Sequence, residues 1–138
     1  MSEYTKMLPP AVDRHGEFYA FCKKYELRFQ RCSNCQAWRH MPRESCAECS
    51  SFDWTWEPSS GKGTLFSWTV IHRALHPGWA DDLPYASVVI EMEEGVRLVS
   101  RLEDVPHDEL VLGLEVEVDF EDVTPEITLH KFRPVRNR

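Results

Sequence analysis

The chain has 138 residues, 42% of them hydrophobic and 12% aromatic, which is enough for one ordinary domain with a core and a small appended unit. This composition excludes a disordered chain, and no apolar run approaches the ~20 residues that cross a bilayer. The formal net charge is −7, and residues 51–138 carry 8 Lys and Arg against 17 Asp and Glu, a balance of −9 that disfavours binding to a phosphate backbone.

The first segment, residues 1–25, is predicted to be helical in its second half. Phe18, Phe21, Cys22 and Tyr25 recur at helical spacing and form one apolar face. Asp13 is the expected N-cap. Because a helix this short is marginal in water, its apolar face must pack on the protein's own body or on a partner. The segment lacks an apolar signal-peptide core, so we expect a cytoplasmic protein with no membrane partner.

The second segment, residues 26–58, contains two Cys-x-x-Cys pairs, Cys32/Cys35 and Cys46/Cys49, separated by ten residues. Alternating apolar residues predict one strand entering the first pair and another leaving the second. Two such turns close a tetrahedron of sulfur around Zn²⁺, and four protein ligands leave no open position, so we predict a structural ion. Iron, a redox dithiol and paired disulfides are the alternatives.

The third segment, residues 59–138, reads as five strands with a tight turn at Glu93–Gly95 and one helical turn within residues 105–113. Alternation in the stretch LEVEVDF predicts a sheet with one face buried. We therefore expect a mainly β protein: an amino-terminal helix, a rubredoxin-like zinc ribbon and a five-stranded OB-fold barrel with antiparallel strands.

Two basic stretches are candidate contacts. The loop of residues 71–85 is long for a hairpin and places His72, Arg73, His76 and Trp79 close together in sequence, which suits a CoA phosphate and adenine or a subunit surface. The alternative is an ordinary loop in which Trp79 folds back over the barrel end. Arg133 lies in a basic tail that grips an acidic partner or is simply solvated.

The succession of pieces resembles a known family, the OB-fold proteins with a rubredoxin-like zinc ribbon that associate with acyl-CoA enzymes. The resemblance covers nearly the whole chain. Its motifs are the four cysteines, Pro42–Arg43 between the pairs, Gly61-x-Gly63, the strand from Ser67 to His72, Leu83–Pro84–Tyr85 and the close at Lys131 to Pro134. Gln36 stands where family members often have Gly, and Met41–Pro42 where they often have Pro-Pro.

The resemblance implies an accessory subunit of a thiolase-like, or lipid-transfer-protein-type, enzyme in a hetero-oligomer acting on a CoA thioester. The stretch Ala37–His40, which includes Trp38, looks closest to the subunits of aldolases that shorten the steroid side chain and release propionyl-CoA. An acyltransferase complex is the alternative within the family. Phe18, Phe21 and Trp38 are then candidate partner contacts.

Catalysis by this chain alone is not predicted. A retro-aldol reaction needs a base and donors for the enolate, and the candidate histidines His40, His72, His76, His107 and His130 show no telling spacing. Two readings from other classes remain: a nucleic-acid-binding OB module, which the charge opposes, and a free-standing acyl-CoA carrier.

Overall fold

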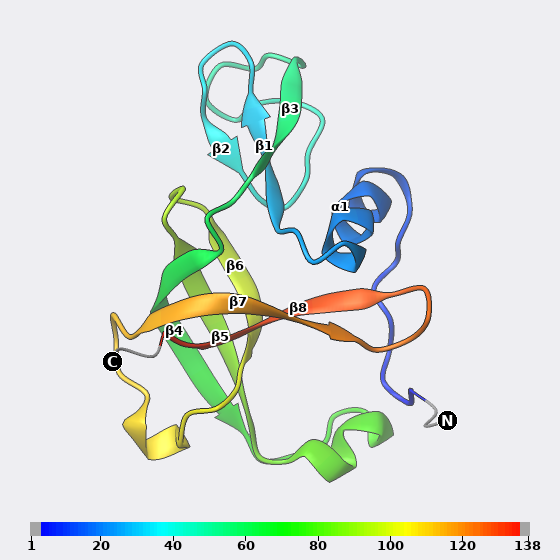
Figure 1. Ribbon diagram of the computed structural model, residues 1–138, viewed down its shortest axis with the longest axis vertical. Coiled ribbons are helices and arrows are strands. Elements are labelled where there is room, and N and C mark those ends of the chain that lie inside the picture. Colours follow the sequence, from blue (N-terminus) through cyan, green and yellow to red (C-terminus); the bar gives the residue numbers. More distant parts are fainter. Residues whose placement is uncertain (1–3, 136–138) are drawn as a thin grey trace.

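The computed structural model describes residues 4–135 and consists of a small three-stranded sheet standing on a closed barrel, with one helix beside the junction (Figure 1). The elements in chain order are α1 (Asp13–Lys23), β1 (Arg28–Cys32), β2 (Trp38–Arg39), β3 (Trp54–Pro58), β4 (Lys62–Ile71), η1 (Pro77–Asp82), β5 (Tyr85–Met92), β6 (Arg97–Leu102), η2 (His107–Glu109), β7 (Glu115–Asp122) and β8 (Thr128–Pro134). The predicted fold class is confirmed. No helix among the described residues is long and apolar enough to cross a membrane.

Helix α1 packs on the protein's own body, against β8 and β1. Phe18 and Cys22 are buried as the apolar stripe predicts, whereas Tyr25 is 57% exposed and lies beyond the end of the helix. The predicted N-cap at Asp13 is wrong. Val12 is the N-cap, with an extended backbone, and its carbonyl accepts a hydrogen bond from the Gly16 amide, so Asp13 is already inside the first turn.

The ribbon sheet, strands β2-β1-β3, is antiparallel throughout. Leu27 and Phe29 are buried as expected from their spacing. The adjacent Gln30 is also fully buried, so the strand does not alternate strictly between buried and exposed residues.

The barrel closes in the order β4-β5-β6-β8-β7. Strand β5 alternates between half-buried and buried residues along its whole length, and Val88 and Ile90 meet Leu65, Leu98 and Phe132 in the core. The expectation that all strands are antiparallel is wrong at one place. Strands β6 and β8 pair in parallel, through Leu102 and Phe132 alone, because these two strands have to meet to close the barrel.

The two glycines of the Gly-x-Gly stretch that leads into the barrel, Gly61 and Gly63, are required for different reasons. Gly61 has φ +78°, a left-handed conformation that favours glycine. Gly63 lies between β5 and β7, and a Cβ atom there would stand 2.6 Å from the Glu91 carbonyl oxygen. The turn therefore requires both glycines, the first for backbone conformation and the second for space.

Candidate functional site

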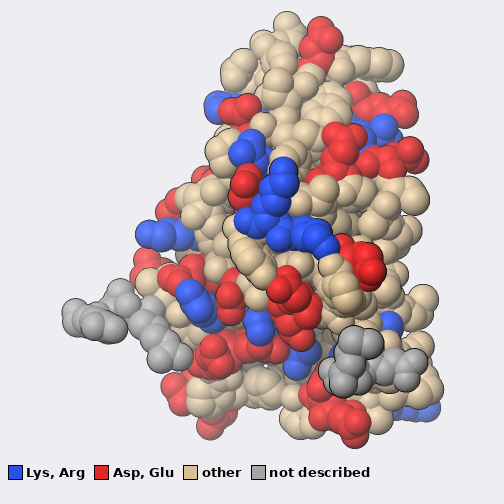
Figure 2. All heavy atoms as spheres, turned by 45° about the vertical axis from the view of Figure 1, so that its right-hand side comes forward, with Lys and Arg blue, Asp and Glu red and all other residues tan. Residues whose placement is uncertain are grey.

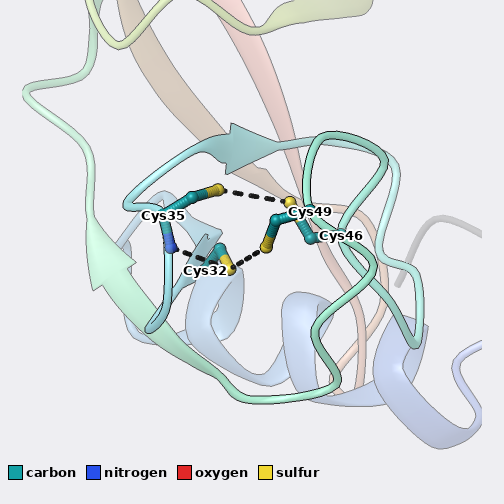
Figure 3. A group of neighbouring side chains, drawn as sticks. All are labelled: Cys32, Cys35, Cys46 and Cys49. Atoms are coloured by element: carbon teal, nitrogen blue, oxygen red, sulfur yellow. Dashed lines mark hydrogen bonds between the residues drawn. The ribbon is translucent and has the colours of Figure 1, made fainter.

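The four cysteines converge (Figure 3) at the end of the ribbon where Cys32 pairs with Trp54, and the opposite end, where Arg28 pairs with Pro58, leads into the barrel. Their sulfur atoms all lie within 4.8 Å of one another. The Cys32 and Cys49 sulfurs are 3.5 Å apart, as are those of Cys35 and Cys46, so each close contact joins one knuckle to the other. This crossing ties the strand that enters the site to the loop that leaves it.

Backbone and side-chain N–H groups point at the sulfurs. The Cys35 amide donates to Cys32 Sγ at 3.4 Å, and the Glu48 amide donates to Cys46 Sγ at 3.3 Å. Backbone amides lower the pKa of Cys32 and Cys46, and the Asn34 side chain lowers that of Cys49. At Cys35 the Ala37 amide lowers the pKa, but the neighbouring thiols of Cys46, Cys49 and Cys32 and the burial of the group together outweigh it and raise the pKa to about 12. Three of the four thiols therefore lose their proton more readily than an ordinary cysteine, and a divalent cation bound by the four sulfurs would displace the protons that remain.

The geometry fits zinc. Tetrahedral Zn–S bonds of about 2.3 Å place sulfurs about 3.8 Å apart, which lies between the 3.5 Å of the two close pairs and the 4.8 Å within which all four sulfurs lie. Cys32 and Cys46 are buried, and four sulfur ligands leave no position for water or substrate. An ion held by these residues would stiffen the ribbon without taking part in a reaction.

The residue after each knuckle lies in the left-handed region, Gln36 with φ 69° and Ser50 with φ 66°. The family resemblance indicated Gly after the first knuckle, and the backbone explains why: glycine adopts this conformation without steric cost. In this chain Gln36 and Ser50 adopt the same conformation although both carry a side chain.

Gln30 is a structural residue that the sequence did not reveal. Its side-chain oxygen accepts from the Arg43 amide at 2.7 Å and from Arg39 Nε at 3.0 Å, and its side-chain nitrogen donates to the Arg43 carbonyl at 2.9 Å. These bonds fasten the segment between the cysteine pairs to β1. The one signal in the sequence was a polar residue next to an inward-facing Phe.

The aromatic candidates on the helix and ribbon are largely engaged within the protein. Phe18 is buried, and its ring lies 5.1 Å from that of His40. Phe21 packs edge-on against Trp56 at 5.6 Å, with the Arg28 guanidinium 5.0 Å from its ring centre. Trp38 is half-buried under Arg31 at 4.8 Å. Their role in binding a partner stays a prediction.

The loop of residues 71–85 does not present its four candidates as one cluster. Trp79 stacks on Tyr85, with ring centres 4.3 Å apart, and Lys6 lies 4.9 Å above it. His76 accepts a hydrogen bond from the Gly78 amide and caps η1. His72 and Arg73 remain exposed, so they are the members of the set free for an external contact.

Arg133 is paired on the barrel surface. Its guanidinium donates to Glu117 at 3.0 and 3.1 Å and lies 3.8 Å from Asp119. Basic side chains gather near the middle of the face shown in Figure 2, with acidic side chains widespread over its lower half. The charge of Arg133 is therefore balanced by acidic side chains of the barrel itself.

The structure brings together three histidines that the sequence left apart. A cavity of about 160 Å³, here called the junction cavity, lies where α1, the ribbon and the barrel meet. His15, His40 and His130 line it, together with Phe18, Tyr19, Met41, Pro42, Arg97, Leu98 and Val99. His130 is enclosed by protein but keeps some accessible surface because it borders the cavity. Burial lowers the pKa of both His40 and His130 to about 4, so both are neutral at physiological pH.

Two family models match consecutive parts of the chain. Residues 20–55 match the ChsH2 rubredoxin-like zinc ribbon domain, and residues 56–121 match the ChsH2 carboxy-terminal OB-fold domain. A solved structure described as an Ltp2-ChsH2(DUF35) aldolase superposes with a TM-score of 0.83 at 36% identity, covering 91% of this chain and 98% of that one.

Curated relatives fall into two groups. A probable enoyl-CoA hydratase alpha subunit of Thermomonospora curvata is 36% identical over 91% of this chain, and a 3-oxo-4,17-pregnadiene-20-carboxyl-CoA hydratase alpha subunit of Mycobacterium tuberculosis is 30% identical over 93%. The chain spans only 39% and 40% of their lengths. A DUF35 domain-containing scaffold protein of Methanocaldococcus jannaschii is 30% identical, with 83% of this chain and 86% of that protein covered.

Proposed function

This chain belongs to the ChsH2 (DUF35) family, and from that premise we propose that it is a non-catalytic accessory subunit that binds and completes a thiolase-like acyl-CoA enzyme. The observation that carries the proposal is the match to the DUF35 chain of an aldolase, which extends over 98% of that chain at 36% identity. A match of that extent includes the ribbon, the helix and the barrel, so the whole unit is available for the same kind of assembly.

The reaction we propose for the complex is retro-aldol cleavage of a β-hydroxyacyl-CoA thioester carrying a steroid side chain. A base removes the hydroxyl proton, the bond between the α and β carbons breaks, and its electron pair passes to the thioester as an enolate. Protonation of the enolate gives propionyl-CoA. The name of the solved relative supports the aldolase chemistry, and that of the Mycobacterium tuberculosis relative supports a steroid-type CoA thioester.

The described residues favour an accessory role over catalysis. The four-sulfur site has no open coordination position for a zinc ion to activate water. His40 and His130 are enclosed and keep depressed pKa values, which makes them weak bases. The partner would therefore supply the base and the enolate donors, while the ribbon and barrel would shape the complex.

A hydratase complex is the second candidate. Two relatives are named as hydratase alpha subunits, and this chain corresponds to about two fifths of each, so it would act there beside a further hydratase domain. An acyltransferase complex is the alternative within the family, in which the chain again would bring subunits together, in keeping with the name scaffold protein of the Methanocaldococcus jannaschii relative. Nucleic-acid binding has less support, because residues 51–138 carry a balance of −9.

The test is co-purification from the native cell followed by assay. The chain is tagged, the bound thiolase-like protein is identified, and the two are assayed alone and together with a β-hydroxyacyl-CoA of a steroid side chain. We expect propionyl-CoA release by the pair and none by this chain. An identified partner that is fully active by itself would refute the accessory role, and conversion of the enoyl-CoA with water would favour the hydratase instead.

A further inference from the structure

The junction cavity lies beside strands β6 and β8, where a single backbone pair closes the barrel. Strands β6 and β8 share a single pair, Leu102 and Phe132, so from Arg97 to Arg101 strand β6 pairs with β5 but not with β8. In this stretch the Ser100 hydroxyl lies 2.8 Å from His130 Nδ1 and bridges β6 and β8 by side chains instead. Helix α1 packs on β8, and residues 40–42 of the ribbon segment complete the lining of the cavity.

The opening of the junction cavity is apolar at its rim as well as inside. Met41 on the ribbon is 52% exposed and Val99 on β6 is 67% exposed, and both line the junction cavity. A second groove shares Tyr19, Val99 and His130 with the cavity and continues to Met7, which is 77% exposed. Exposed apolar side chains that border a continuous cavity and groove are typical of an interaction surface, whereas isolated ones are common on any protein.

The size of the junction cavity restricts its occupant. A cavity of about 150 Å³ holds one benzene ring, so 160 Å³ admits one large side chain but not a four-ring steroid nucleus. Its lining consists of three histidines, aromatic rings, aliphatic groups and Arg97. Arg97 is paired with Glu91 at 3.3 Å and stacks on Phe66, so the lining offers a CoA phosphate no unpaired Lys or Arg side chain.

We propose that the junction cavity receives one aromatic or branched aliphatic side chain of the thiolase-like partner and is the anchor point of the complex. The inference rests on the proposed function and adds the place of contact. Anchors of this kind sit in desolvated pockets surrounded by contacts that exclude water, and a few of them carry most of the binding free energy. Met41, Val99 and the groove beyond them would form the rim.

The test is to block the cavity mouth and measure binding of the purified, zinc-loaded chain to the wild-type partner by calorimetry. Val99→Trp places an indole at the mouth, and Met41→Glu puts a charge on the part of the lining that the ribbon contributes. Val111→Trp is the matched control, because Val111 is also an exposed valine, at 55%, and lies outside the cavity and the groove. Melting temperature and zinc content establish that each variant is folded.

We expect both cavity variants to weaken the complex by about 30-fold or more, and the control to change its Kd by less than about 3-fold. If wild type binds and Val99→Trp and Met41→Glu bind equally well, the anchor is elsewhere and the inference fails while the proposed function stands. If wild type binds no thiolase-like protein, the proposed function itself fails, and the inference with it. A structure of the complex with an acyl chain in the cavity would also overturn the inference.

Discussion

Replacing Gly63 by alanine tests the close packing of the barrel. Gly63 pairs with Met92 on one side and Val116 on the other, and an added Cβ would lie 2.6 Å from the Glu91 carbonyl oxygen, 2.8 Å from Ile90 Cγ2 and 3.1 Å from Met92 Cα. Two of these atoms belong to the backbone and cannot rotate away. The added methyl group must therefore push β4 and β5 apart.

Overpacking of this kind costs about 1–3 kcal/mol, and backbone contacts place Gly63→Ala near the upper end. At about 2.1 cal/mol/K per residue, a chain of 138 residues has an unfolding entropy of about 0.29 kcal/mol/K. The expected fall in Tm is therefore about 10 °C, measured by calorimetry at a fixed zinc concentration.

Gly113→Ala is the control, because it introduces strain in the backbone conformation without any steric overlap of the added methyl group. Gly113 has φ +85° but nothing within 4 Å of its added Cβ. Left-handed strain of about 1 kcal/mol is partly offset by the lower entropy of the unfolded alanine chain, so Tm falls by about 3 °C at most. A Gly63→Ala protein that melts within 2 °C of wild type, or above Gly113→Ala, would refute the packing account.

Three further predictions concern the ribbon and the histidines. Cys46→Ser is expected to lower zinc content and to raise hydrogen exchange across residues 28–58 while the barrel stays protected, whereas Cys22→Ala, a buried cysteine outside the site, keeps its zinc; full zinc in Cys46→Ser would exclude the four-sulfur site. Ser50→Gly relieves a left-handed backbone and is expected to raise Tm by about 2–3 °C, while Ser50→Val lowers it, and the reverse order of melting would show that the turn is unstrained. Burial depresses the pKa of His130 to about 4 from an unfolded value of about 6.5, so its contribution to stability is present above pH 6.5 and lost as pH falls towards 4, by up to about 3 kcal/mol. Measured by urea unfolding, the free energy of unfolding of His130→Gln should therefore fall less between pH 6.5 and pH 4 than that of wild type. The exposed-site control His72→Gln should behave like wild type, and an equal fall in all three proteins would contradict the linkage.

The elements that the sequence predicted well are those fixed by local chemistry. The Cys-x-x-Cys spacing brings two sulfurs to one turn wherever the turn lies in the protein, so the metal site was readable before any fold was known. Alternation in β5 and the turn at Gly95 likewise express a local rule, since a strand with one buried face needs period two and a tight turn needs a left-handed residue.

Local rules failed where a competing contact decided the outcome. Asp13 has the chemistry of an N-cap, but the Val12 carbonyl starts the helix one residue earlier. His76 and Trp79 lie close to His72 and Arg73 in sequence, yet His76 caps η1 and Trp79 stacks on Tyr85. Proximity along the chain therefore did not bring the four side chains into one cluster.

The amino-acid sequence alone determined a four-cysteine metal site, a mainly β architecture and an acidic barrel. Each of these depends on residues close together in the chain or on the summed composition and charge. Only the tertiary structure decided that His15, His40 and His130 line one cavity and that β6 and β8 pair with each other at one position. Those contacts join segments up to 115 positions apart, and no spacing rule relates residues that meet only because separate elements pack together.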